Sequence, residues 1–486
     1  MMKTFLLLVL ISFQLVCAQQ VTFFKTFGHG IYDSGEGVWQ ANDTGYVVGG
    51  ITTQSGTNGT DMLIYKTDSL GNLQWYKNIG LQNSIEGAKS ITGCRAFNEY
   101  LLAGYQNRYD TSGYNFYAVK TNANGDTLWS RIYGGSDWDM AYSADTLQDS
   151  TYVIAGETFS FGNGNLDMYV IRINKNGDTL WTRTFGGTDD DYARYVFTDR
   201  HNNIMVIGTT HSFGSGGSDV YLVYLNAMGD TIWTKAYGTL EDEFGYSGDM
   251  YIDNSNKMSF GLAYTQFNPV SNAQESRICR LDSVSGVLFY DYSLYFGQPE
   301  ILDHMRMRRD GNGRFYYTGD LRYLTDGPTD VNLHRTTYGM GFSATTYILP
   351  LLEFEYPMDV RKCYDNGLVV TGSTTSYGPG PTSTFILKTD TILVVPLTPV
   401  VSAENYDLVD FNVFPNPVVN NLISINTGQP IEEIRLIDLN GKVIQVINGQ
   451  DFTSQTVVIN EFTTGLYIIE VITNEGAGRK KLFIQN

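Results

Sequence analysis

Polar residues that could exchange protons or bind an anion gather between residues 262 and 350. This stretch contains the pairs Asp303-His304 and His334-Arg335. A histidine beside an aspartate can act as an acid or base near neutral pH, and arginine can hold an anionic group. These residues nevertheless match no recognised catalytic triad and no metal-ligand spacing. We therefore predict no catalytic residues, and we keep Asp303, His304, His334 and Arg335 as candidate ligand contacts.

A second set of residues could hold a cation. Seven carboxylates each stand 14 to 18 residues before a recurring glycine, and acids at one repeat position would form a ring that calcium could bind. The alternative is that each acid accepts backbone N–H groups at an irregular turn, which we favour because ligand sites rarely occur in every repeat. We predict no metal and no cofactor, with calcium left open. The seven acids are Glu36, Glu86, Asp139, Asp191, Glu243, Asp303 and Glu355.

The elements that would position these side chains are repeats. Seven glycines end the most regular β-like runs, at spacings of 54, 52, 52, 53, 58 and 53 residues. A period near fifty with strand chemistry is typical of propeller blades, each built from four strands. We predict an all-β fold, with a seven-bladed β-propeller over residues 19–392. The glycines are Gly50, Gly104, Gly156, Gly208, Gly261, Gly319 and Gly372.

The run NKNGDTLWTRTFGG at residues 174–187 could be mistaken for a phosphate-binding loop. It recurs at residues 124–135 and 228–238, and no strand-to-helix transition follows it, so we interpret it as scaffold. Asn-Gly predicts a hairpin turn, and the following Trp should pack between neighbouring blades. The first residues after the leader, VTFFKTFG at 21–28, match the same strand and should complete the last blade.

Composition and the N-terminus exclude several classes of function. The formal net charge of −19 argues against nucleic acid as a partner, and no later stretch is apolar enough for a transmembrane helix. Residues 1–18 read as a secretory signal peptide, with a lipid-anchored Cys17 as the rival interpretation. The remaining cysteines form no disulfide or metal pattern, so we expect buried thiols.

The C-terminal part has a different character. A linker with two prolines covers residues 393–410, and short alternating strands over 411–486 predict a small, immunoglobulin-like β-sandwich. This tail resembles the type A C-terminal sorting domain of cargo of the type IX secretion system of Gram-negative bacteria. The residues that carry the resemblance are Pro415, Asn416, Pro417, Asp438, Gly441, Lys442, Gly465, Tyr467 and Lys481.

The resemblance implies that the secretion machinery recognises residues 411–486 and that the protein is released outside the cell or attached to the outer-membrane surface. Bacterial β-propeller repeats often precede such domains. We expect a non-enzymatic recognition or adhesion module for extracellular carbohydrate or a surface partner. A polysaccharide hydrolase or lyase with its site in residues 262–350 is one alternative, and a structural surface spacer is another.

Overall fold

The computed structural model describes residues 21–484, with gaps at 29, 54–58, 82–83, 95, 109–112, 253–255, 270–272, 294–299, 310–314, 324–329, 336–344, 350–353, 391–392, 394–410, 419–420, 429, 438–442, 450–453, 460–464 and 474–475. The expected signal peptide and nearly all of the expected linker therefore lie outside the described residues. The chain divides into two compact units, residues 1–400 and 401–486.

The described elements are strands without any helix, so the all-β prediction is confirmed. Described strands up to residue 388 form seven antiparallel sheets of four strands each. The sheets are β2 (Tyr32–Gln40), β3 (Tyr46–Thr53), β4 (Asp61–Thr67), β5 (Leu73–Ile79); β6 (Ser84–Cys94), β7 (Glu99–Arg108), β8 (Asn115–Thr121), β9 (Thr127–Tyr133); β10 (Asp139–Thr146), β11 (Tyr152–Thr158), β12 (Asp167–Ile173), β13 (Thr179–Phe185); β14 (Asp191–Thr198), β15 (Ile204–Thr210), β16 (Asp219–Leu225), β17 (Thr231–Tyr237); β18 (Glu243–Ile252), β19 (Met258–Asn268), β20 (Ala273–Asp282), β21 (Leu288–Ser293); β22 (Glu300–Arg309), β23 (Phe315–Tyr323), β24 (Asp330–Arg335), β25 (Thr345–Leu349); and β26 (Glu355–Lys362), β27 (Leu368–Thr374), β28 (Ser383–Lys388) with β1 (Phe23–Phe27).

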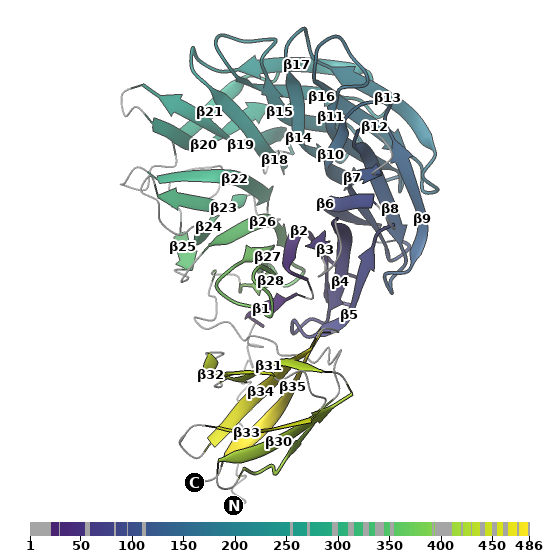
Figure 1. Ribbon diagram of the computed structural model, residues 1–486. Coiled ribbons are helices and arrows are strands. Elements are labelled where there is room, and N and C mark those ends of the chain that lie inside the picture. The colour runs from purple at the N-terminus through teal and green to yellow at the C-terminus, as the bar shows by residue number, and fades with distance from the viewer. Residues whose placement is uncertain are drawn as a thin grey trace, which may run out of the picture. The chain divides into compact units, whose positions relative to one another are not determined.

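The first strand of each sheet lies at the centre of a ring of sheets (Figure 1). These inner strands contact one another in a closed cycle from β2 through β6, β10, β14, β18, β22 and β26 back to β2. The middle strands are apolar runs that are buried on both faces, as in β15 and β16, because neighbouring sheets cover them.

The N-terminal strand is shared with the end of the repeat region. β1 pairs antiparallel with β28, with Phe23 opposite Lys388 and Phe27 opposite Thr384. This pairing confirms that the N-terminal segment joins the last repeat. The sheet edge that β28 would otherwise expose is thereby covered by a strand from the other end of the unit.

The repeated tryptophans connect neighbouring sheets. Trp181 donates its indole N–H to the carbonyl of Ala227 at 3.1 Å, in the hairpin of the next sheet, and Trp129 does the same to Lys175 at 3.0 Å. The ring lies directly over the hairpin glycine, since a Cβ at Gly229 would stand 2.9 Å from Trp181. Gly229 also has a φ of +79°, which only glycine adopts without strain. The predicted turn and packing roles of this motif are confirmed.

The three cysteines of the described repeat region, Cys94, Cys279 and Cys363, are free and buried, as expected from their spacing. No helix among the described residues has the length and the hydropathy needed to cross a bilayer.

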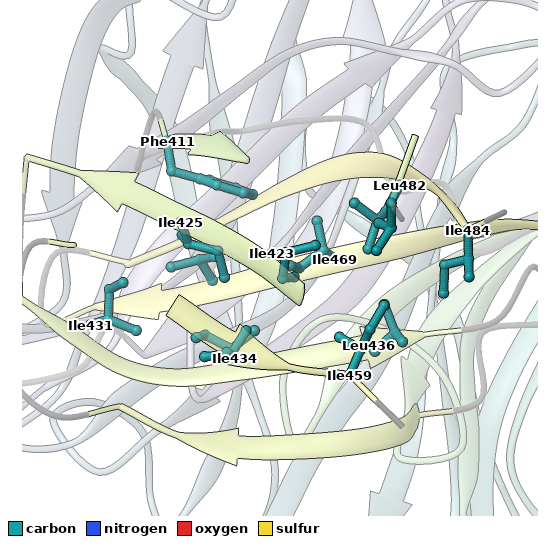
Figure 2. Close-up of a cluster of buried hydrophobic side chains, with 13 residues drawn as sticks. Phe411, Ile423, Ile425, Ile431, Ile434, Leu436, Ile459, Ile469, Leu482 and Ile484 are labelled. Carbon is teal, nitrogen blue, oxygen red and sulfur yellow. The ribbon is translucent and has the colours of Figure 1, made fainter. Parts of the chain in front are cut away.

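The C-terminal unit has a core of its own. One sheet contains β29 (Phe411–Phe414), β30 (Leu422–Thr427) and β33 (Ser454–Val458), and the other contains β32 (Val443–Asn448), β31 (Ile431–Ile437), β34 (Gly465–Thr473) and β35 (Gly476–Ile484). Both sheets contribute to one cluster of buried side chains, in which Ile425 of the first sheet and Ile434 and Ile469 of the second take part (Figure 2). Burial of this shared cluster stabilises the unit.

Candidate functional site

The recurring acids at the start of the inner strands are occupied by structural hydrogen bonds. Asp139 accepts the N–H of Gly135 at 2.8 Å and the hydroxyl of Ser160 at 2.9 Å. Glu243 accepts the N–H of Thr239 at 2.8 Å and its hydroxyl at 2.7 Å. Asp139 and Glu243 therefore satisfy donors in the turns that lead into β10 and β18, whereas Glu86 and Glu355 accept from side chains of the next strand, Gln106 and Thr374. Among the described residues, no group of three or more His, Cys, Asp or Glu side chains is placed to hold a metal ion.

The strand registers correct the sequence alignment at two of the seven positions. Five acids stand two residues before a β-bulge of their inner strand, as Asp139 does before the register shift between Ala141 and Ser143. In β2 this position belongs to Asp33, and Glu36 is the extra residue of the bulge itself. In β22 the shift begins at Asp303, whose side chain lies outside the described part. A bulge adds a residue without changing the polar pattern, so spacing alone did not reveal it.

The bulge residues of the inner strands differ from repeat to repeat. Glu36 of β2 pairs with Lys89 of β6 at 3.1 Å. Arg194 of β14 lies between the rings of Tyr142 and Tyr192, at 4.3 and 4.4 Å from their centroids. The Glu36–Lys89 ion pair and the Arg194–Tyr142 cation–π contact join neighbouring sheets, whereas the contact of Arg194 with Tyr192 lies within β14. The charged bulge residues thus find partners among themselves, and we interpret these contacts as interactions that stabilise the packing of neighbouring inner strands.

The predicted ligand contacts do not form a described cluster. His334 is fully buried in β24, where its ring stacks on Tyr317 with centroids 4.7 Å apart. Burial lowers the pKa of His334 to about 3, so the ring is neutral at physiological pH and unsuited to proton exchange. Arg335 ends β24, two strands away from β22, and the side chains of Asp303 and His304 on β22 lie outside the described residues.

A cavity of ligand size lies at one end of the sheet β18–β21. Its volume is about 390 Å³, within the range of small-molecule sites. Residues 239–241 of the loop before β18, residues 266–269 at the end of β19, and Glu275 and Arg277 of β20 line it. We refer to this cavity as the β19–β20 pocket.

A hydrogen-bond network fixes two polar side chains of the wall of the β19–β20 pocket, Glu275 and Arg277. Arg277 makes a bidentate ion pair with Asp291, at 3.1 and 2.7 Å, and also donates to the hydroxyl of Tyr264 at 3.1 Å. Glu275 accepts from the side-chain amide of Asn268 at 2.5 Å and from the hydroxyl of Ser293 at 3.0 Å. Polar side chains whose positions are fixed in this way are suited to recognise a ligand with little loss of entropy.

The pocket lies partly within the segment 262–350 in which the repeats diverge, with residues 239–241 before that segment, and none of its lining residues is among the predicted ligand contacts. In the neighbouring sheet the corresponding hairpin reads SFGSGGSD, whereas the end of β19 and the residues that follow it read QFNPV. The loss of the glycine-rich hairpin together with the appearance of Gln266, Asn268 and Arg277 was the available signal. The prediction relied on histidines and aspartates, and it therefore selected Asp303, His304 and His334.

The sorting-motif residues take structural positions in the C-terminal unit. Asn416 accepts the backbone N–H of Phe483 at 2.9 Å, and Pro415 and Pro417 flank it in the loop after β29. The loop is thereby joined to the last strand. Gly465 begins β34 and pairs with Ile484, and the partly buried Tyr467 packs against the core cluster. Lys481 pairs through its backbone with Ile468; its side chain, like all of Asp438, Gly441 and Lys442, lies outside the described residues.

Comparison with known proteins gives a family match for the C-terminal tail and does not indicate what the repeats bind. Residues 412–485 match the family model of the secretion system C-terminal sorting domain. No curated protein matches the chain. A crystal structure of a protein of unknown function from Dyadobacter fermentans has 11% identity and a TM-score of 0.44, covering 75% of this chain and 98% of that one.

Two further solved structures are similar to this chain. Polysaccharide lyase Uly1 has 9% identity and a TM-score of 0.46, with 74% of this chain and 90% of that chain covered. The β-propeller domain of the trilobed protease from Pyrococcus furiosus has 10% identity and a TM-score of 0.41, with 76% and 93% covered. Residues 412–485 thus match the sorting domain that type IX secretion cargo carries, and the sheets ahead of them have a β-propeller arrangement.

Proposed function

We propose that the protein is a seven-bladed β-propeller, exported by the type IX secretion system, that recognises extracellular carbohydrate without turning it over. Seven four-stranded sheets in cyclic contact, closed by β1, support the blade count. Two sheets around one core support a sandwich for the sorting domain, whose match supports the route of export. Residues 19–392, 393–410 and 411–486 are the corresponding propeller, linker and sorting domain.

The β19–β20 pocket is the observation that carries the binding role. Sugar rings present several hydroxyls, each a donor and an acceptor, around a weakly apolar face. The side-chain amides of Gln266 and Asn268 offer both kinds of hydrogen bond, and Phe267 supplies an apolar ring. The pocket interrupts the repeat pattern, which is where a specific site on a symmetric scaffold is expected.

A glycan array probed with the purified mature protein tests the proposal. Binding to a defined saccharide is expected, together with its loss in the double variant Gln266→Ala, Asn268→Ala. His211→Ala is the matched control, because His211 lies in the corresponding hairpin of the neighbouring sheet. Absence of binding to every saccharide, or equal binding by the double variant, would contradict a carbohydrate site in this pocket.

A polysaccharide-acting enzyme is the second candidate, because Glu241 and Glu275 line the same cavity. Glycosidases use two carboxylates, one as acid and one as base or nucleophile. In this protein Glu275 is held by Asn268, Ser293 and Arg277, which suits a binding role more than proton transfer. Release of new reducing ends or unsaturated products by the wild type, abolished in Glu241→Gln and Glu275→Gln, would favour the enzyme.

A further inference from the structure

The β19–β20 pocket has an excess of negative charge. Its wall carries the carboxylates of Glu241 and Glu275 and the guanidinium of Arg277. Asp242 follows Glu241 directly and is bound through Oδ1 to the backbone N–H and the hydroxyl of Ser218, both neutral donors. Acids therefore outnumber bases at this end of the sheet, and the local potential favours a cation.

The single basic group of the pocket wall is already neutralised. Arg277 holds Asp291 in a bidentate pair with Oδ1 at 3.1 Å and Oδ2 at 2.7 Å, and its other nitrogen lies 3.6 Å from Glu275. Asp291, behind the wall, thus uses most of the positive charge that Arg277 supplies. An acidic saccharide would find no available cation here, because binding its carboxylate would require breaking this pair.

Glu241 is the group left to face a ligand. No described residue forms an ion pair with its carboxylate, and its backbone N–H donates to the Thr239 hydroxyl at 3.2 Å, which fixes the loop. Phe267 and Pro269 line the same pocket. A pocket that contains both a carboxylate and an apolar ring can receive an ammonium group carried on a sugar ring whose face packs on the aromatic side chain.

We infer that the β19–β20 pocket selects saccharides that carry a free amino group over their neutral N-acetylated counterparts, with Glu241 as the residue that determines this preference. The inference rests on the proposed function and adds the substrate class. The ammonium pairs with Glu241 while hydroxyls bond to Gln266 and Asn268, so both the charge and the sugar contribute to binding.

Calorimetric titration of the mature protein with a glucosamine oligosaccharide and with the N-acetylated oligosaccharide of equal length tests this inference. We expect the amine to bind about threefold to tenfold more tightly at neutral pH and low salt, a difference that shrinks as salt screens the charges. Glu241→Gln should remove this preference while retaining binding to the N-acetylated sugar. Asp189→Asn, at the corresponding loop position of the neighbouring sheet, is the matched control and should keep the preference.

Equal affinity for the two oligosaccharides in the wild type would overturn the amine preference and leave carbohydrate binding in place. A preference that persists in Glu241→Gln would overturn the role of Glu241. Absence of binding to either oligosaccharide, with binding to other saccharides on the array, would also reject the amine preference alone. Absence of binding to any saccharide would reject the proposed function as well.

Discussion

The pairing of β1 with β28 makes the first residues of the mature chain structural, and Phe24→Ala tests this directly. Phe24 is fully buried and packs edge-to-face on Phe385 of β28, with ring centroids 5.6 Å apart. It also approaches Tyr377 at 6.3 Å. Truncation leaves a cavity that the surrounding sheet cannot refill, because β1 is held by its ladder to β28.

Removal of a buried phenylalanine side chain costs about 3–5 kcal/mol. A native domain is stable by about 5–15 kcal/mol, so the loss is a large part of the total. In a unit of this size, with an unfolding entropy of about 2.1 cal/mol/K per residue, it should lower the midpoint of thermal unfolding by about 4–6 °C. The half-exposed Phe97 provides the control, since Phe97→Ala should cost under about 1 kcal/mol.

Differential scanning calorimetry of the two variants and the wild type measures the loss of unfolding free energy and the shift of the unfolding midpoint. We expect Phe24→Ala to be destabilised well beyond Phe97→Ala and to become sensitive to proteolysis near its N-terminus. If the two variants melt together, β1 is a loosely attached strand and the closure of the ring by the N-terminus is wrong.

Three further predictions follow from the repeated contacts and the tail. Trp181→Ala should cost about 1–3 kcal/mol in urea unfolding because it removes the packing on the Gly229 hairpin, and an unchanged midpoint would contradict the fastening role. Burial, with the adjacent Asp191, raises the pKa of Asp167; its stabilising contribution is therefore present below about pH 4 and lost as pH rises through the raised value. Asp167→Asn, which copies Asn115 of another sheet, should raise the melting midpoint at neutral pH but not in acid, and an equal effect at both would refute this. Deletion of residues 412–485 should leave a folded propeller inside the periplasm, detected by cell fractionation, whereas normal surface display would refute the sorting role.

Much of the architecture could be predicted because the same turn and packing requirements recur in successive repeats. Gly229 must adopt a positive φ and lie under Trp181, so glycine and tryptophan recur together. Phe23 occupies the equivalent place on Gly71, which is why the first strand could be assigned to the last repeat. Local turn chemistry and packing of this kind are legible in sequence.

The site was harder to predict, because it depends on registers and on contacts between distant segments. A bulge in β2 moved Asp33, and not Glu36, into line with the other acids. His334 resembled a catalytic residue by type, yet the fold buries it against Tyr317. Glu241, in the loop before β18, and Arg277, in β20, line the same pocket, and no spacing in the sequence indicates that they lie near each other.

Hydrogen–deuterium exchange with and without the tightest-binding saccharide tests the central claim most directly, because it reports where the ligand lies without presuming the site. We expect protection concentrated in the segments 239–241, 266–269 and 275–277, which contain the residues that line the β19–β20 pocket. Protection concentrated instead on the inner strands around Tyr142 and Arg194, with the pocket segments unchanged, would contradict it.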